Sequence, residues 1–123
     1  MQQNQKIMAK ILIIDDERAI RNTLKEILEF ESYTAEVAEN GRAGLDRALT
    51  GAYDLIFTDI KMPEMDGMEF MAKYREGMAQ QNSEEAPGDV ITGHGSVDTA
   101  VEALKGGAYE FIQKPLDLNR LLP

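Results

Sequence analysis

The chain has 123 residues, no cysteine and a formal net charge of −9, from 13 basic and 22 acidic residues. This length suits one domain with a single core, and the lack of cysteine excludes disulfides, thiolate metal sites and cysteine nucleophiles. The acidic balance argues against binding of nucleic acid or of an anionic membrane through bulk charge. No apolar stretch reaches the roughly 18 to 20 residues of a membrane span, and the polar start of the chain does not resemble a signal peptide, so we expect a cytoplasmic protein.

The first predicted strand ends in a run of carboxylates. Residues 11–14 form an apolar, β-branched run, which is typical of a buried strand. Asp15, Asp16 and Glu17 follow it directly. Apolar residues then recur every three or four positions over residues 20–28, which predicts a helix. On the plainest interpretation, Asp15 or Asp16 is the cap of that helix.

The next three predicted elements lead to a second strand that ends in a carboxylate. Residues 33–38 are less apolar, as an edge strand would be, and residues 43–49 predict a short helix that ends near Gly51. Residues 55–57 then form a near-continuous apolar run before Asp59. Such a run is expected for a strand covered on both faces of a parallel sheet.

The second half of the chain continues the alternation. We expect a helix over residues 67–81, a very short strand over 90–92, and a helix that Ser96 begins and Gly106 ends. A last strand over residues 109–112 precedes the beginning of a final helix, which the end of the chain truncates.

Five alternations of strand and helix define the expected fold class. They predict an α/β domain with a doubly wound, five-stranded parallel sheet, because right-handed crossovers leave few other topologies. The flavodoxin-like strand order 2-1-3-4-5 places the first and third strands side by side. The carboxyl ends of these two strands then meet at one edge of the sheet.

Three carboxylates are expected to share that edge. Asp15, Asp16 and Asp59 would repel one another there unless they protonate or bind a cation. Oxygen ligands without histidine or cysteine suit Mg²⁺. Thr92 and Lys114 follow the neighbouring strands, and a hydroxyl and an ammonium group beside such a cation could bind phosphoryl oxygens. Each of these residues also has an ordinary structural interpretation, but their joint placement favours a functional site.

This ordered set of motifs resembles the receiver domains of two-component response regulators. The resemblance covers residues 10 to about 122 and rests on the following motifs: Asp15-Asp16, Asp59 with Met62-Pro63 and Asp66-Gly67 after it, Thr92, and Lys114-Pro115. It implies a CheY-like receiver domain over residues 10–123, with an N-terminal tail over residues 1–9. It also implies a signalling domain rather than an enzyme, at most catalysing its own phosphorylation and dephosphorylation.

The resemblance assigns a role to each matching residue. Asp59 would accept a phosphoryl group from a sensor histidine kinase. Asp16 would bind Mg²⁺ directly, Asp15 partly through water, and the backbone carbonyl of Lys61 would be a further ligand. These four positions make up the expected metal and phosphoacceptor site.

Three further residues would respond to the phosphoryl group. Thr92 would be the switch hydroxyl, Lys114 the phosphate-binding cation and Phe111 the aromatic switch residue, and the surface around the fourth helix and fifth strand would then change. His94 lies close to this site in the sequence, and its plainest interpretation is a solvated loop residue.

The segment from Gly93 to Tyr109 resembles receivers of activators of sigma-54-dependent transcription. That resemblance implies a longer, multidomain regulator, with an AAA+ ATPase and a DNA-binding domain after the receiver. The expected partners are a sensor kinase and this downstream effector, with no direct contact between the receiver and nucleic acid or membrane.

Two departures from the family pattern generate expectations of their own. The segment from Glu76 to Pro87 is lengthened, and Asp89 enters the fourth strand, where a buried unpaired carboxylate would cost several kcal/mol. Asp89 is therefore expected at the exposed amino-terminal rim, or the strand is short or irregular. The truncated last helix leaves Leu118, Leu121 and Leu122 as an apolar patch that could pair with a second copy.

Two other functions remain open from the sequence. One is a receiver-like scaffold that binds partners without phosphorylation; the intact acidic set argues against it, and the altered fourth strand argues mildly for it. The other is a Mg²⁺-dependent phosphohydrolase with Asp59 as its nucleophile, although the sequence shows no clear separate acid/base group or substrate pocket.

Overall fold

The computed structural model describes residues 10–86, 88–93 and 110–113. In this part of the chain, five parallel strands form one sheet in the order β2-β1-β3-β4-β5, which confirms the predicted flavodoxin-like order. The strands are β1 (Lys10–Ile14), β2 (Thr34–Ala38), β3 (Leu55–Asp59), β4 (Gly88–Gly93) and β5 (Glu110–Gln113).

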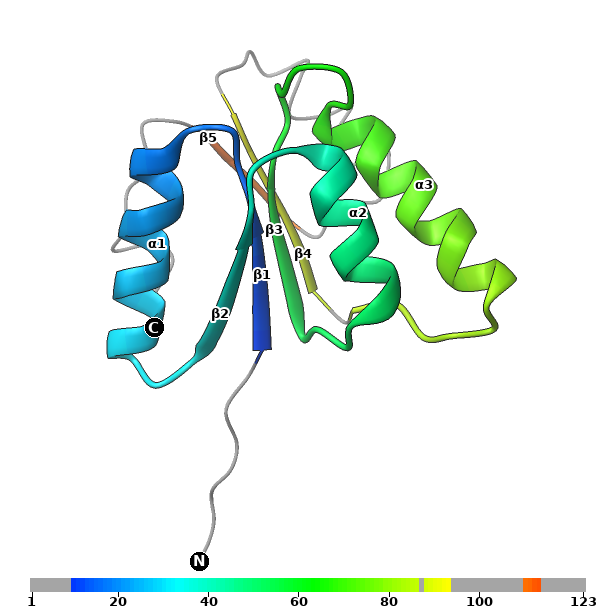
Figure 1. Ribbon diagram of the computed structural model, residues 1–123, viewed down its shortest axis with the longest axis horizontal. Coiled ribbons are helices and arrows are strands. Elements are labelled where there is room, and N and C mark those ends of the chain that lie inside the picture. The colour runs from blue at the N-terminus through cyan, green and yellow to red at the C-terminus, as the bar shows by residue number, and fades with distance from the viewer. Residues whose placement is uncertain (1–9, 87, 94–109, 114–123) are drawn as a thin grey trace, which may run out of the picture.

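Helices cover both faces of this sheet. Helix α1 (Arg18–Phe30) lies on one face, and α2 (Gly41–Thr50) and α3 (Gly67–Gln80) lie on the other (Figure 1). The predicted helices over residues 20–28, 43–49 and 67–81 are thereby confirmed, with ends that differ by a few residues. Among the described helices, none is long and apolar enough to cross a lipid bilayer.

The sheet separates two apolar cores, and the central strands supply residues to both. Successive side chains of a strand point to opposite faces. Leu12 and Ile14 of β1 therefore pack in the core beneath α2 and α3, whereas Ile11 and Ile13 pack in the core beneath α1. In β3 the same alternation sends Ile56 to the first core and Phe57 to the second.

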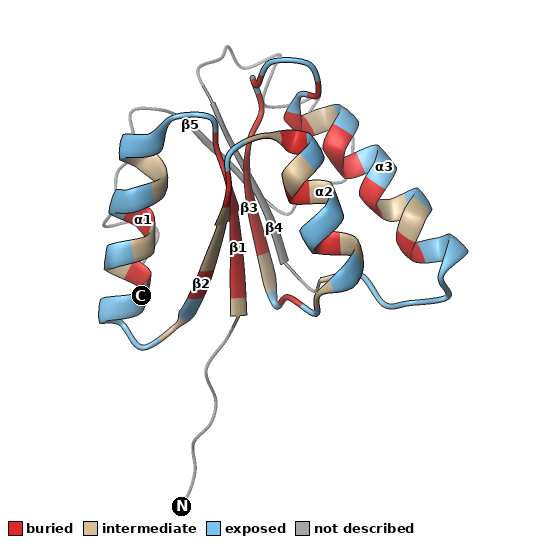
Figure 2. Ribbon diagram, viewed as in Figure 1, coloured by how far each residue is buried: buried red, intermediate tan, exposed pale blue. Residues whose placement is uncertain are grey.

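Burial on both faces explains why these strands read as continuous apolar runs. Buried residues follow one another along β1 and β3, whereas in the edge strand β2 only Ala35 and Ala38 are buried (Figure 2). Each fully buried aliphatic side chain stabilises the fold by roughly 2 kcal/mol. The predicted character of the central strands and of the edge strand is confirmed.

Two of the three described helices begin with a side-chain cap. Asn40 Oδ1 accepts a hydrogen bond of 2.8 Å from the Ala43 amide at the start of α2. Asp66 Oδ1 accepts one of 2.8 Å from the Glu69 amide at the start of α3. Helix α1 instead begins after Glu17, whose side chain makes no capping hydrogen bond. The interpretation of Asp15 or Asp16 as the cap of α1 is therefore wrong, because α1 begins beyond both of them.

Strand β4 differs from its expectation in length. It spans six residues rather than three, and its parallel register with β3 is continuous from Gly88 to Thr92. Asp89 is its second residue and pairs with Ile56, so its backbone lies near the amino-terminal end of the strand, and the predicted exposure of its side chain stays a prediction. The other expectation, a short or irregular strand, is wrong. The tail over residues 1–9 and the two predicted helices after β4 and β5 lie outside the described residues.

Candidate functional site

The sheet register brings the predicted acidic residues to one edge. Ile14 of β1 pairs with Thr58 of β3, so Asp15 and Asp59 directly follow neighbouring residues at the carboxyl ends of adjacent strands. Asp15 and Asp59 are buried, at 0% and 4% exposure, whereas Asp16 is exposed. The site therefore has a buried acidic floor and an acidic residue that solvent can reach.

The carboxylates after β1 lie close enough to bind one cation. Asp15, Asp16 and Glu17 each offer a carboxylate oxygen, and these oxygens lie within 4.8 Å of one another. Carboxylates at such distances repel one another, and a divalent cation relieves that repulsion. Hard cations such as Mg²⁺ take oxygen ligands of this kind and keep several waters. The residues at this edge therefore fit the predicted Mg²⁺ site. Glu17, the third carboxylate in the run, was not among the predicted ligands, but its position within 4.8 Å of the other two adds it to the set.

Three hydrogen bonds fix Asp15. Its backbone amide donates to the Ala38 carbonyl of β2 at 3.2 Å, and its Oδ1 accepts from the Glu17 amide at 2.9 Å. Its backbone carbonyl accepts a hydrogen bond of 2.8 Å from Nη1 of Arg21, in the second turn of α1. In the sequence, Arg21 is one of the charged residues that lie between the apolar positions of this helix. No local motif marks its contact with Asp15, which the docking of α1 creates.

The loop after Asp59 is part of the core. Ile60, Met62 and Met65 are buried, although they lie in a loop rather than in a strand or helix. The amide of Gly67 donates to the carbonyl of Ile60 at 2.8 Å and closes the loop. This apolar anchoring holds the segment that follows Asp59 against the fold, and the exposed Lys61 lies within it.

Gly67 explains why this loop needs a glycine. A Cβ atom at Gly67 would lie 2.4 Å from the carbonyl oxygen of Asp59 and 2.9 Å from Cα of Ile60. Both neighbours are backbone atoms of the candidate phosphoacceptor segment, so neither can move without displacing that segment. The Asp66-Gly67 turn therefore lets α3 begin in direct contact with the end of β3.

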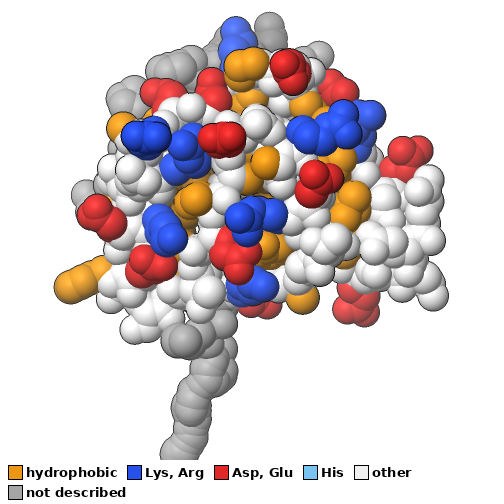
Figure 3. Space-filling view, viewed as in Figure 1, with side chains coloured by type: hydrophobic (Ala, Val, Ile, Leu, Met, Phe, Trp, Pro, Cys, Tyr) orange, Lys and Arg blue, Asp and Glu red, His pale blue; other side chains and the backbone are white. Residues whose placement is uncertain are grey.

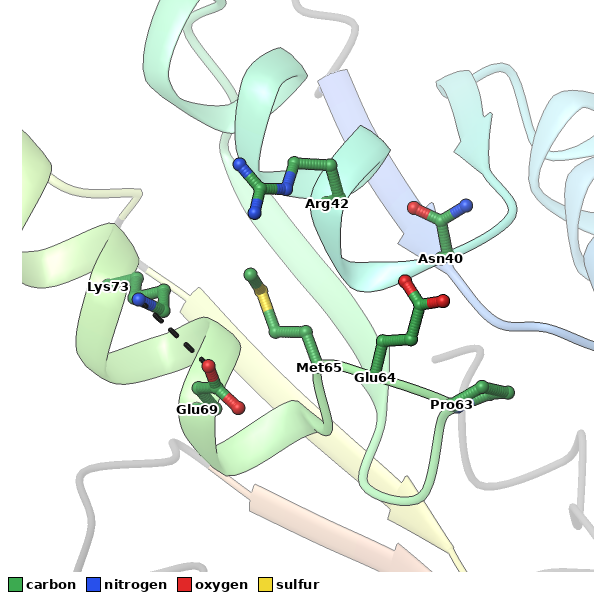
Figure 4. A pocket seen from close by; sticks show the side chains of 7 residues that line it. All are labelled: Asn40, Arg42, Pro63, Glu64, Met65, Glu69 and Lys73. Carbon is green, nitrogen blue, oxygen red and sulfur yellow. Dashed lines mark ion pairs between the residues drawn. The ribbon is translucent and has the colours of Figure 1, made fainter.

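Two hollows adjoin the acidic edge. One of about 130 Å³ lies between the start of α2, the loop after β3 and α3, where Lys73 and Glu69 form an ion pair of 3.9 Å (Figure 4). The other, of about 290 Å³, includes the side chains of Asp16 and Arg21 in its lining. Asn40, Pro63 and Glu64 line both hollows, so the two form neighbouring depressions beside the acidic site.

A second polar cluster surrounds Glu36, nearer the amino-terminal ends of the strands. Tyr53 donates a hydrogen bond of 2.6 Å to Glu36, and Arg47 and Lys10 form ion pairs with it at 3.2 and 3.7 Å. The hydrogen bond from Tyr53 and the two cations lower the pKa of Glu36, although its partial burial opposes them. Burial and the adjacent Glu36 carboxylate raise the pKa of Tyr53 to about 12. The Glu36 carboxylate is thus held by partners within the protein itself, the Tyr53 hydroxyl and the two cations.

The remaining predicted site residues lie on β4, on β5 or beyond them. Thr92 pairs in register with Asp59, so its backbone lies directly beside that of the candidate phosphoacceptor. Phe111 of β5 pairs with Ile91 of β4, one position before Thr92. Lys114, which follows β5, and His94, which follows β4, lie outside the described residues.

The strand order defines a flavodoxin-like domain. Its candidate cation site lies at the topological switch point, where the adjacent strands β1 and β3 end in carboxylates. The family of the response regulator receiver domain matches residues 11–123, and the chain belongs to that family.

Relatives within this family cover almost the whole chain. It is 34% identical over 113 residues to the response regulator MprA of Mycolicibacterium vanbaalenii, an alignment that covers 92% of this chain and 47% of that protein. It is 38% identical over 114 residues to the nitrogen assimilation regulatory protein NtrX of Azorhizobium caulinodans, with 91% and 24% covered. The chain therefore spans less than half of the length of either relative.

A solved structure shows the same fold. The CheY-like response regulator receiver domain protein from Methanospirillum hungatei JF-1 superposes with a TM-score of 0.79 at 32% identity, covering 94% of this chain and 88% of that one. The resemblance stated from the sequence motifs is thus confirmed at the level of the family and of the fold.

Proposed function

We propose that this receiver domain accepts a phosphoryl group on Asp59, in a reaction that requires Mg²⁺, and thereby switches the state of an output domain or partner. The observation that carries the proposal is the position of Asp59. It is the last residue of β3, it pairs in register with Thr92, and its strand adjoins the one that ends in the acidic cluster. A nucleophile, a cation site and a hydroxyl-bearing residue therefore come from adjacent strand ends.

The residues that would hold Mg²⁺ are Asp15, Asp16, Asp59 and the backbone carbonyl of Lys61. When bound, the ion supplies positive charge next to the oxygens of the incoming phosphoryl group. Transfer of a phosphoryl group depends mainly on positioning and on such charge stabilisation. Glu17 adds a further carboxylate within reach of the same ion.

The phosphoryl transfer itself exchanges one bond for another. A carboxylate oxygen of Asp59 forms a bond to phosphorus while the bond from phosphorus to the imidazole nitrogen of a kinase phosphohistidine breaks. The imidazole leaves with the electron pair of the broken bond, and Asp59 becomes an aspartyl phosphate. Lys114 and Thr92 would bind the phosphoryl oxygens through charge-assisted hydrogen bonds.

The output follows from a shift between two states. Thr92 would move toward the new phosphoryl oxygens and Phe111 would turn into the space it leaves, which would change the surface around the predicted fourth helix and β5. We propose a sensor histidine kinase as the phosphodonor and a separate effector domain as the recipient of the signal. An AAA+ ATPase followed by a DNA-binding domain is the proposed effector, and pairing of two copies is a further proposed output.

The similarity to regulatory proteins supports this assignment of the output. Among the relatives are the transcriptional regulatory protein ZraR of Klebsiella oxytoca, at 36% identity, and the regulatory protein AtoC of Escherichia coli, at 35%. In both, the matched region is about a quarter of the protein, at 24% and 23% of its length. A receiver that controls a larger transcriptional regulator is therefore the proposed context of this domain.

The test is the intact mass of the chain after incubation with acetyl phosphate, with and without Mg²⁺. We expect one phosphoryl adduct that requires Mg²⁺ and is absent in Asp59→Asn. Asp54→Asn is the matched control, because Asp54 precedes the opposite end of β3, where its carboxylate accepts a hydrogen bond from the Lys10 amide. An adduct that persists in Asp59→Asn would overturn the assignment of the phosphoacceptor. Absence of any adduct in a folded chain that binds Mg²⁺ would favour the scaffold function.

A further inference from the structure

Arg21 reaches from α1 to the backbone between two candidate metal ligands. Its Nη1 atom lies 2.8 Å from the carbonyl oxygen of Asp15, and the side chain is half-buried. The same side chain lines the hollow that contains Asp16 and the neighbouring hollow floored by Val37 and Ala38. Arg21 therefore lies between the helix, the edge strand and the acidic site.

The hydrogen bond acts on the peptide group that joins Asp15 to Asp16. This group is planar, so the direction of the Asp15 carbonyl also determines where the Cα of Asp16 lies. The amide of Asp15 is already fixed by its hydrogen bond to Ala38, and Oδ1 of Asp15 by the Glu17 amide. These bonds do not fix the rotation of the peptide group between Asp15 and Asp16. The hydrogen bond from Arg21 to the Asp15 carbonyl restrains that rotation.

We propose that Arg21 is a positioning residue for the acidic site: its guanidinium holds the Asp15–Asp16 peptide and so orients both carboxylates for Mg²⁺ and for phosphoryl transfer. This inference rests on the proposed function of the site. Groups that orient metal ligands through a hydrogen bond typically contribute about 10- to 100-fold to metal affinity. Arg21 touches neither the ion nor the phosphoryl group in this role.

The direction of the change in Mg²⁺ affinity on removal of Arg21 distinguishes a positioning role from a purely electrostatic one. A cation near three carboxylates repels Mg²⁺, so removal of the Arg21 charge alone would strengthen Mg²⁺ binding. Loss of positioning would weaken it. The two explanations thus predict opposite changes in the same dissociation constant.

The experiment compares three variants with the unaltered chain. Arg21→Met keeps much of the apolar stem and removes every donor, whereas Arg21→Lys keeps the charge and one donor group. Arg18→Gln removes an equal charge from an exposed position at the start of the same helix and serves as the control. For each chain we would measure the Mg²⁺ dissociation constant by calorimetry and the rate of adduct formation with acetyl phosphate. We would also measure the rise in unfolding temperature that a fixed Mg²⁺ concentration produces.

We expect Arg21→Met to bind Mg²⁺ roughly tenfold more weakly, and its rise in unfolding temperature with Mg²⁺ to shrink accordingly. Arg21→Lys should recover part of the affinity, and Arg18→Gln should bind as tightly as the unaltered chain or more tightly. A purely structural role would lower the unfolding temperature without Mg²⁺ and leave the Mg²⁺-dependent rise unchanged.

Two outcomes would overturn the inference in distinguishable ways. Unchanged or tighter Mg²⁺ binding in Arg21→Met, with normal binding and phosphorylation of the unaltered chain, would overturn the role of Arg21 alone. Failure of the unaltered chain to bind Mg²⁺ would overturn the proposed function, and the role of Arg21 with it.

Discussion

Two clusters of charged residues on the same sheet differ in how their carboxylates are satisfied. At the carboxyl edge, Asp15, Asp16 and Glu17 gather carboxylate oxygens within 4.8 Å of one another. Around Glu36, a tyrosine hydroxyl and two cations converge on one carboxylate. The first cluster brings several negative charges together. The second surrounds one negative charge with a hydroxyl donor and two positive charges.

This difference supports the acidic edge, rather than the Glu36 cluster, as the candidate cation site. The Glu36 cluster is complete within the protein, since its hydrogen bonds and ion pairs favour the ionised carboxylate and lower its pKa. Carboxylates brought close together repel one another, and a bound cation relieves that repulsion. Elsewhere on the surface, acidic and basic side chains are interspersed on the side shown in Figure 3. The grouping of Asp15, Asp16 and Glu17 thus contrasts with the mixed charge seen on that side.

The largest expected effect comes from Gly67, where α3 begins in close contact with the backbone at the end of β3. In Gly67→Ala, the new Cβ would meet the Asp59 carbonyl oxygen at 2.4 Å, so we expect a loss of roughly 3 kcal/mol in the free energy of unfolding. Gly77→Ala in the same helix is the control, because its Cβ would meet the flexible end of Leu49 at 2.6 Å. Its loss should stay below about 1 kcal/mol, partly offset by the helix propensity of alanine. Urea unfolding of both variants measures the difference, and equal losses would contradict the packing argument.

The next effect separates the two clusters by their response to Mg²⁺. At a Mg²⁺ concentration about 100 times the dissociation constant, the unaltered chain should gain about 2.7 kcal/mol in the free energy of unfolding. Asp16→Asn should lose most of this gain, because it removes an exposed carboxylate of the acidic cluster. Glu36→Gln should keep all of it, although it weakens the fold without Mg²⁺. Urea unfolding with and without Mg²⁺ measures these gains. Equal Mg²⁺-dependent gains in stability for Asp16→Asn and Glu36→Gln would contradict the assignment of the cation site to the acidic cluster.

A smaller effect is expected from the hydrogen bond between Tyr53 and Glu36. Tyr53→Phe removes the 2.6 Å hydrogen bond and should cost about 1 kcal/mol at neutral pH. The folded chain raises the pKa of Tyr53 from 10.0 to about 12, so folding favours the neutral phenol. Its contribution is complete below pH 10 and is lost as the pH rises from 10 toward 12. Between pH 10 and 12, the free energy of unfolding, measured by urea unfolding at each pH, should therefore fall more steeply for the unaltered chain than for Tyr53→Phe.

The smallest effect is expected from Arg47, at the exposed side of the Glu36 cluster. Its ion pair with Glu36 measures 3.2 Å, but half of its side chain is exposed, at 51%. Arg47→Gln should cost no more than about 0.5 kcal/mol, and less in high salt. Urea unfolding at low and high salt measures this. A cost above that of Tyr53→Phe would show that charge, rather than the buried hydrogen bond, holds Glu36 in place.

Much of the architecture could be predicted from the sequence because local patterns report burial directly. The apolar runs at β1 and β3 predicted central strands covered on both faces, and the alternation of elements predicted the strand order. Asp15, Asp16 and Asp59 could be placed at one edge because parallel strands end on the same side of a sheet. These predictions need only the period of a strand or helix and the handedness of a crossover.

Contacts between elements could not be predicted in the same way. The length of β4 depends on its pairing with β3, the burial of Met62 and Met65 depends on how their loop packs, and the reach of Arg21 to Asp15 depends on the docking of α1. The sequence by itself therefore determined the sheet, its order and the acidic edge. Only the tertiary structure decided how that edge is held, because a hydrogen bond or a backbone contact between one element and another leaves no periodic signal in either of them.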